Sequence, residues 1–278
     1  MRVLRLACLA VVLSPVLASG AGIAAPMPLV QHRAVYDLNL SDASSNSGIT
    51  GISGRMVYEI RGSACEGYTV RFRYVTQSQT REASQITDQQ TTTFEDADGK
   101  SFSFATKSYT DQNLDKELRG NATREAQGVK IQIDKPEPKS FELQPTQFPT
   151  QHLVDLIHRA KEGETFYETS IYDGSEDADK AMTTTVIVGK QATTTNNDPE
   201  RKALDKLGGE KFWPVDIAYF DETSEEGGED TPEYRISFKL YENGLTRDLQ
   251  MDYGDFVIRG RLVDLAVFEP DDKSTCDR

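Results

Sequence analysis

The chain has 278 residues and a formal net charge of −14 at pH 7, with 45 acidic against 31 basic residues. This acidic balance argues against binding to nucleic acid and against direct docking on anionic lipid. The length is sufficient for one large domain or two small ones, each with a proper hydrophobic core.

Residues 1–25 predict a cleavable signal peptide. Arg2 and Arg5 supply positive charge, residues 6–17 form an apolar run, and small residues suited to a signal peptidase follow. We therefore expect export to a bacterial periplasm and a single mature domain over residues 26–278. Without the two arginines the mature charge would be about −16. No later apolar run in the sequence is long enough to span a membrane.

Alternation of apolar and polar residues dominates the mature chain and predicts a mostly β, antiparallel protein. The alternating segments are residues 56–61, 68–75, 129–133, 183–187, 215–219, 234–240, 245–251 and 256–262. Between two of these segments, Glu242-Asn243-Gly244 predicts a tight hairpin turn. The whole pattern accommodates about fourteen strands, enough to curl into an incompletely closed barrel.

One segment near residues 150–162 predicts an amphipathic helix instead. Its apolar residues at helical spacing are Leu153, Leu156, Ile157 and Ala160. Thr150 is the expected N-cap, and Gly163 lies just beyond the expected end. We expect this helix to pack across the sheet or to plug its open end.

Two polar stretches, residues 193–210 and 221–232, are expected to be mobile loops. The second is strongly acidic but lacks the ligand spacing of a calcium-binding loop. We therefore expect it to be solvated rather than to bind a metal.

Cys8 lies in the predicted signal peptide, so cleavage would leave two cysteines, Cys65 and Cys276. They lie near opposite ends of the mature chain, and an oxidising compartment favours a structural disulfide between them. The alternative is a pair of free thiols with a redox role. Acidic neighbours around both cysteines disfavour the thiolate that redox chemistry needs.

No sequence motif indicates catalysis or cofactor binding. P-loop, dinucleotide-binding and serine-nucleophile patterns are all missing from the sequence. The three histidines are His32, His152 and His158, and the last two would point to nearly opposite faces of the helix. We expect no metal, no cofactor and no enzymatic activity. A glycan hydrolase stays open as a hypothesis, because 45 acidic residues offer many carboxylate pairs.

Aromatic residues on the alternating segments are candidates for lining a cavity inside a curled sheet. The candidates are Tyr36, Tyr58, Phe72, Tyr74, Trp213 and Tyr219. Ordinary core packing is the alternative for each of them. Because Pro214 cannot donate a ladder hydrogen bond, it predicts an edge strand or a strand start next to Trp213.

An ordered set of short segments resembles the EipB-type periplasmic cell envelope integrity family of alphaproteobacteria. The segments are residues 32–38, 54–59, 65–68, 148–152, 172–175, 213–215, 219–220 and the C-terminal Cys276. The resemblance covers essentially the whole mature chain. It implies a β-spiral, in which a long antiparallel sheet winds into an open barrel with one helix and a disulfide.

The resemblance also implies a non-enzymatic role in keeping the cell envelope intact, and it carries over no ligand-binding or catalytic residue. We expect the protein to bind an envelope protein or a hydrophobic or extended ligand in a barrel-like cavity. The alternative is a periplasmic carrier of lipid or lipoprotein. Neither nucleic acid nor an integral membrane segment is expected.

Overall fold

The protein is built on one antiparallel sheet of fifteen strands. The computed structural model describes residues 29–175, 177–204, 211–221 and 231–269. The strands are β1 (His32–Ala43), β2 (Ile49–Ser63), β3 (Gly67–Thr80), β4 (Ser84–Glu95), β5 (Ser101–Thr110), β6 (Asn113–Arg124), β7 (Val129–Lys135), β8 (Lys139–Leu143), β9 (Phe166–Ile171), β10 (Met182–Val188), β11 (Ala192–Thr193), β12 (Lys211–Phe220), β13 (Tyr234–Tyr241), β14 (Thr246–Asp252) and β15 (Phe256–Val267). The predicted fold class is confirmed, with one strand more than the sequence pattern suggested.

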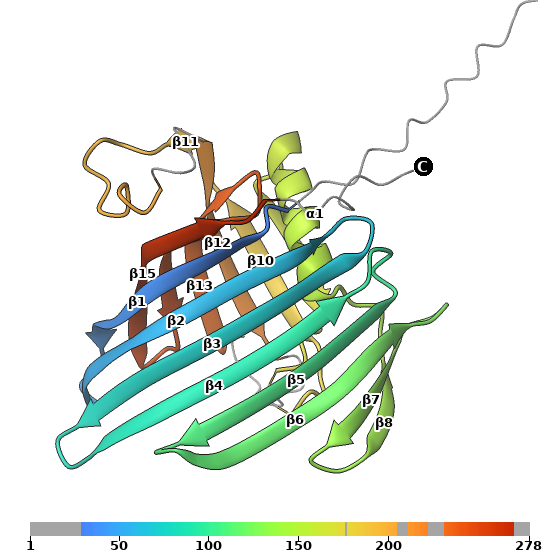
Figure 1. The fold of residues 1–278 in the computed structure, drawn as a ribbon, viewed down its shortest axis with the longest axis horizontal. Coiled ribbons are helices and arrows are strands. Elements are labelled where there is room, and N and C mark those ends of the chain that lie inside the picture. The colour runs from blue at the N-terminus through green and yellow to red at the C-terminus, as the bar shows by residue number, and fades with distance from the viewer. Residues whose placement is uncertain (1–28, 176, 205–210, 222–230, 270–278) are drawn as a thin grey trace, which may run out of the picture.

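The first and last strands in chain order, β1 and β15, lie side by side at the centre of the sheet. The order runs β8-β7-β6-β5-β4-β3-β2-β1-β15-β14-β13-β12-β10-β9, with β11 paired to β12. Strands β1 to β6 form the wall nearest the viewer in Figure 1, while β10, β12 and β13 lie behind it. Strands β8 and β9 are the two ends of the order, so the sheet curls without closing.

Helix α1 (Pro149–Glu162) lies between the two walls, close to the predicted position. Its residues Leu156, Ile157 and Ala160 are at most 5% exposed and join a core with Val186, Trp213, Val215, Ile217 and Leu240. We call the face of the sheet that contacts this core the inner face. The helix ends as predicted at Gly163, whose positive φ of 84° suits glycine.

The predicted N-cap of α1 is wrong. Phe148 occupies that position, and no side chain of the capping residue bonds the helix. Instead the Glu95 carboxylate at the end of β4 accepts hydrogen bonds from the backbone N–H groups of Thr150 (2.8 Å) and Gln151 (2.9 Å). A carboxylate at this position also interacts favourably with the helix dipole. The cap therefore comes from a strand that is distant in sequence.

A second packed core fills the inner face where β5, β6 and β7 lie. Phe102, Phe104, Leu118 and Ile131 are at most 2% exposed. Phe148 stacks on Phe102 with ring centroids 5.3 Å apart, and Tyr172 packs edge-on against the same ring. The inner face is therefore filled around these residues.

The described part of the expected loop at residues 193–210 is an ordered cover rather than a free loop. Leu204 is 4% exposed and packs on the core under β1, β14 and β15. Glu200 is 2% exposed and its Oε1 accepts the backbone N–H groups of Asp248 (3.1 Å) and Leu262 (2.6 Å). These groups lie beyond Leu249, where the β14–β15 ladder stops. The carboxylate thus satisfies donors that the ladder leaves unpaired.

Arg247 neutralises the buried Glu200 carboxylate. It is fully buried, and its Nη1 lies 2.8 Å from Glu200 Oε2 and 2.9 Å from Asp198 Oδ2. Its Nε donates to the Tyr241 hydroxyl at 2.8 Å, and Nη2 donates to Thr194 at 3.1 Å. Every polar edge of the guanidinium therefore has a partner, as burial of a charge requires.

Of the two positions predicted for Trp213 and Pro214, the edge strand is wrong, because β12 lies between β13 and β10. The alternative, a place near the start of a strand, agrees with β12, which begins at Lys211. Proline is tolerated at this position inside the sheet for a local reason. β10 ends at Val188, opposite Val215, and the Pro214 carbonyl accepts the N–H of Gly189 just beyond that end. The N–H that proline lacks would point to this side, where no strand continues.

Several expectations fall outside the described residues. The predicted signal peptide, most of the acidic segment at residues 221–232 and Cys276 all lie outside the described residues. Cys65 lies in the turn between β2 and β3, and its pairing with Cys276 stays a prediction. Within the described residues, no helix is long and apolar enough to cross a membrane.

His152 is a buried titratable residue on α1. It is 5% exposed, and its Nε2 has no hydrogen-bond partner among the described residues. Burial lowers its pKa to about 4 from 6.5, although Asp155 opposes the shift. His32 is also buried, at 2% exposure, and its Nδ1 lies 2.8 Å from the Val30 carbonyl oxygen, so it has a structural role.

We expect Glu200→Gln to lower the free energy of unfolding by about 3 kcal/mol, because it leaves a fully buried arginine with one charged partner fewer. Equilibrium unfolding in urea measures this. The matched control is Glu164→Gln, which removes the partly exposed ion pair with Arg159 and should cost at most about 1 kcal/mol. Equal losses in the two variants would contradict a special role for the buried network.

We expect acid to destabilise the fold between pH 6.5 and about 4 through His152. In this range the unfolded histidine binds a proton and the folded one does not, so stability is complete above pH 6.5 and falls as the pH falls. The full loss is about 3 kcal/mol at about 1.4 kcal/mol per pKa unit. Urea unfolding at several pH values should give a shallower decline for His152→Gln than for the parent. His158→Gln, on the exposed side of α1, should keep the parent's slope, and an unchanged slope in His152→Gln would refute the assignment.

Candidate functional site

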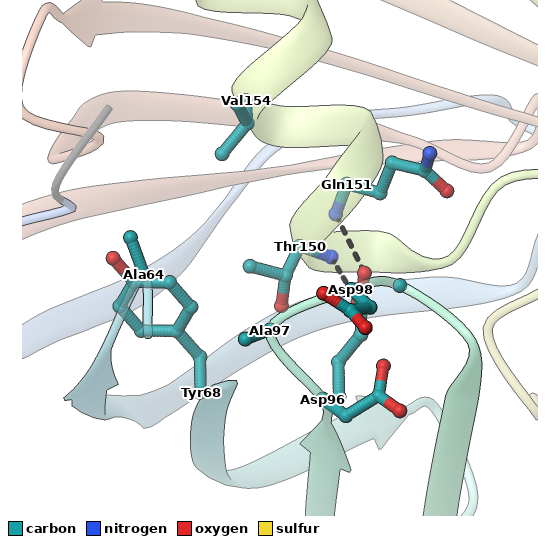
Figure 2. A pocket seen from close by; sticks show the side chains of 10 residues that line it. Ala64, Tyr68, Asp96, Ala97, Asp98, Thr150, Gln151 and Val154 are labelled. Atoms are coloured by element: carbon teal, nitrogen blue, oxygen red, sulfur yellow. Dashed lines mark hydrogen bonds between the residues drawn. The ribbon is translucent and has the colours of Figure 1, made fainter. Parts of the chain in front are cut away.

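A pocket of about 180 Å³ lies at the N-terminus of α1 (Figure 2). Its walls come from the β2–β3 turn, the start of β3, the β4–β5 turn and the first turns of the helix. The lining residues are Ala64, Tyr68, Glu95, Asp96, Ala97, Asp98, Gly99, Thr150, Gln151 and Val154. The pocket is therefore acidic on one side and apolar on the other.

The carboxylates of this pocket are already engaged in the fold. Glu95 caps α1, and burial raises its pKa although the two helix N–H bonds oppose the shift. Asp96 accepts hydrogen bonds from the Lys100 N–H and the Ser101 hydroxyl. Asp98 pairs with the Lys100 ammonium at 2.9 Å. The Glu95 contacts join the end of β4 to the helix, and the aspartate contacts order the β4–β5 turn itself, so these carboxylates have structural roles without a ligand.

The inner face of β2 and β3 offers a different surface. Strand pairing places Tyr58 beside Phe72 and Met56 beside Tyr74, with the side chains of each pair on one face. Phe72 and Tyr74 stack with ring centroids 6.1 Å apart. Tyr58, Phe72 and Tyr74 are all half-buried, in contrast to the filled inner face under β5, β6 and β7. This part of the inner face keeps accessible aromatic surface.

The opposite wall contributes a second group of aromatic rings. Tyr219 on β12 packs on Tyr234 of β13 at 5.5 Å, and Tyr234 packs on Tyr253 at 5.0 Å. Tyr253, in the β14–β15 turn, stacks on Phe256 at 5.0 Å. Burial raises the pKa of the Tyr74 hydroxyl on β3, and the nearby Tyr253 adds to this shift. The rings thus connect the two walls of the curled sheet.

We call the accessible rings of both walls the inner aromatic surface. Its members are Tyr58, Phe72, Tyr74, Tyr219, Tyr234, Tyr253 and Phe256. Burial raises the pKa of the Tyr58 and Tyr219 hydroxyls, although both rings keep accessible surface. Surface that is accessible but lies within the curl of the sheet is suited to a bound ligand.

The structure divides the six predicted cavity residues. Tyr58, Phe72, Tyr74 and Tyr219 belong to the inner aromatic surface, whereas Tyr36 and Trp213 are packed into the core with 1% and 6% exposure. The Tyr36 hydroxyl donates to the Thr246 carbonyl at 2.6 Å. Tyr36 and Trp213 therefore support the fold and present no free face to a ligand.

The sequence interpretation missed Tyr234, Tyr253 and Phe256. Tyr234 follows the same alternation as Ile236 and Phe238 and was recognisable as inward-facing. Phe256 begins the alternating segment at residues 256–262, whereas Tyr253 lies in the β14–β15 turn, where alternation is interrupted. Their part in the surface depends on how the two walls meet, which no local pattern shows.

The inner strands do not bring two carboxylates together. Among the described inward-facing residues of β2–β5, β12 and β13, Glu95 is the one carboxylate, and it caps the helix. A glycosidase needs a pair of carboxyl groups that flank the scissile bond. These strands therefore give no support to the hydrolase hypothesis.

Three comparisons place the chain among known proteins. Residues 23–269 match the model of the family described as EipB-like. The chain is 51% identical over 253 residues to "Cell envelope integrity protein EipB" of Brucella abortus, which covers 91% of this chain and 89% of that protein.

A solved structure agrees with the fold. The crystal structure of a beta-barrel-like protein of a domain of unknown function from Brucella abortus superposes with a TM-score of 0.82 at 50% identity. It covers 87% of this chain and 100% of the other. The name of the relative denotes a role in the cell envelope and no enzymatic reaction. On its sequence and its fold, the chain belongs to the EipB-like family.

Proposed function

We propose that this protein is a non-enzymatic periplasmic protein that supports the integrity of the cell envelope. It acts by holding a segment of a partner protein, or an extended and partly apolar ligand, on the inner aromatic surface. The observation that carries the proposal is the half-buried state of Tyr58, Phe72, Tyr74 and Tyr219 on a face that is filled around Phe102, Phe104 and Leu118. Aromatic side chains combine a large apolar area with low conformational freedom, which suits a binding surface.

The sequence and the relative support the place of action. Residues 1–25 have the features of an export signal. The relative from Brucella abortus is named for cell envelope integrity. A β-rich domain with a predicted disulfide suits the oxidising periplasm.

Native mass spectrometry of protein isolated gently from its own cells tests the ligand. We expect a defined additional mass on the parent protein and its loss or strong reduction in Phe72→Ala, because that variant removes a ring from the centre of the inner aromatic surface. Phe94→Ala is the matched control, since Phe94 is 39% exposed and its position on β4 places it on the outer face. A bare parent mass in repeated preparations would refute the ligand and direct attention to the outer surface.

The second candidate function is a carrier that moves lipid or lipoprotein between membranes. The open sheet favours it, because β8 and β9 end the strand order without pairing to each other. A carrier must release its cargo, whereas a stable binding protein retains it. We expect a carrier to transfer a fluorescent phospholipid from donor to acceptor vesicles at a rate that rises with protein concentration. Transfer no faster than in a protein-free control would exclude this function for the lipid tested.

A further inference from the structure

The inner face changes from apolar to polar as it passes from β3 to β4 and β5. On the inner face, Val70 of β3 pairs with Thr93 of β4, Phe72 with Thr91, and Tyr74 with Gln89. On the next strand, Thr106 and Ser108 of β5 pair with Thr91 and Gln89 of β4. We call Gln89, Thr91, Thr93, Thr106 and Ser108 the polar inner strip. None of these side chains carries a charge.

The polar inner strip is accessible. All five of its residues are half-buried, whereas their outward neighbours Gln90, Thr92 and Ala105 are exposed. On β6, the inward-facing Leu118 lies next to Thr106 and is 2% exposed. The strip thus lies between the inner aromatic surface and a filled core, on a part of the inner face that no described segment covers completely.

Most of the hydrogen-bonding capacity of the strip is unused. Thr91 and Thr106 share one hydrogen bond of 3.0 Å between their hydroxyls. Among the described residues, the side chains of Gln89, Thr93 and Ser108 make no hydrogen bond. Lys116, the next inward residue beside Ser108, is paired with Asp177 at 2.7 Å. The strip therefore presents amide and hydroxyl groups without a net charge.

This composition limits the chemistry of a ligand. An ionised head group would find no opposite charge on the strip to offset the loss of its hydration. A purely apolar acyl chain would cover the Gln89 amide and the hydroxyls without replacing their hydrogen bonds to water. A ligand with an apolar side and several uncharged hydroxyl groups satisfies both surfaces at once.

We propose that the inner face binds an uncharged glycan chain, with sugar faces against Phe72 and Tyr74 and hydroxyl groups hydrogen-bonded to the polar inner strip. This inference rests on the proposed function, since it names the class of ligand for the same surface. Gln89 supplies two donors and one acceptor, and each threonine supplies one donor and an acceptor. Gln89 and Thr91 lie beside Tyr74 and Phe72 on the adjacent strand, so one extended ligand can contact the rings and the polar groups together.

Isothermal titration of the purified protein tests this assignment with a panel of neutral hexasaccharides: chitohexaose, cellohexaose and maltohexaose. We expect at least one to bind and the double variant Gln89→Leu/Thr91→Val to weaken it by about tenfold to a hundredfold, because two hydrogen-bonding positions are lost. The matched control is Gln90→Leu/Thr92→Val, which makes the same changes on the outer face of the same strand and should leave the affinity unchanged. Circular dichroism and urea unfolding confirm that both variants fold.

Palmitic acid, titrated in parallel, separates failure of this inference from failure of the proposed function. Binding of palmitic acid without any hexasaccharide, or equal glycan affinity in the inner variant and the parent, would overturn the glycan assignment and leave a ligand-binding surface in place. If neither probe binds and the native protein carries no additional mass, the proposed function falls with it. Selective loss of glycan binding in the inner variant supports both.

Discussion

The pairing of β1 with β15 is the constraint on which the rest of the structure depends. The ladder runs from His32 opposite Val267 to Ala43 opposite Phe256, so the two ends of the described chain form the centre of the sheet. From this centre, β2 to β8 extend in one direction and β14 to β9 in the other. Because strands twist with a fixed hand, two such wings curl toward each other. Their inner faces then enclose α1, which contributes Leu156 and Ile157 to the core between them.

The buried network around Glu200 supports this centre. The β1–β15 register shifts between Val35 and Tyr36, and the β14–β15 ladder stops at Leu249. At the gap, Glu200 accepts the backbone N–H groups that the ladder leaves free, and Arg247 balances its charge. An irregular sheet is tolerated because a side chain from a long connection completes its hydrogen bonds. A polar loop that looked mobile in the sequence is thereby part of the sheet's stability.

The inner face combines three surfaces with different roles. It is filled around Phe102, Phe104 and Leu118, and it is covered by α1 next to β10 and β12. It stays accessible along β3, β4, the part of β5 with Thr106 and Ser108, and the aromatic rings opposite. A sheet that only had to fold would favour apolar residues along the whole inner face. The change from Phe72 to Thr91 along one row of pairs is therefore the feature that links the fold to the ligand binding that we propose.

The sequence by itself determined the elements. Alternation specified β2, β3, β7, β10 and β12 to β15, helical spacing specified α1, and Gly163 marked its end. These signals are local and depend on neighbouring residues only. Tertiary structure decided what the residues do. Trp213 and Tyr36 became core while Tyr253 joined the inner aromatic surface, and Glu95 rather than Thr150 capped the helix. Each of these outcomes depends on contacts between strands far apart in the chain, and no local pattern encodes which distant wall a side chain will meet.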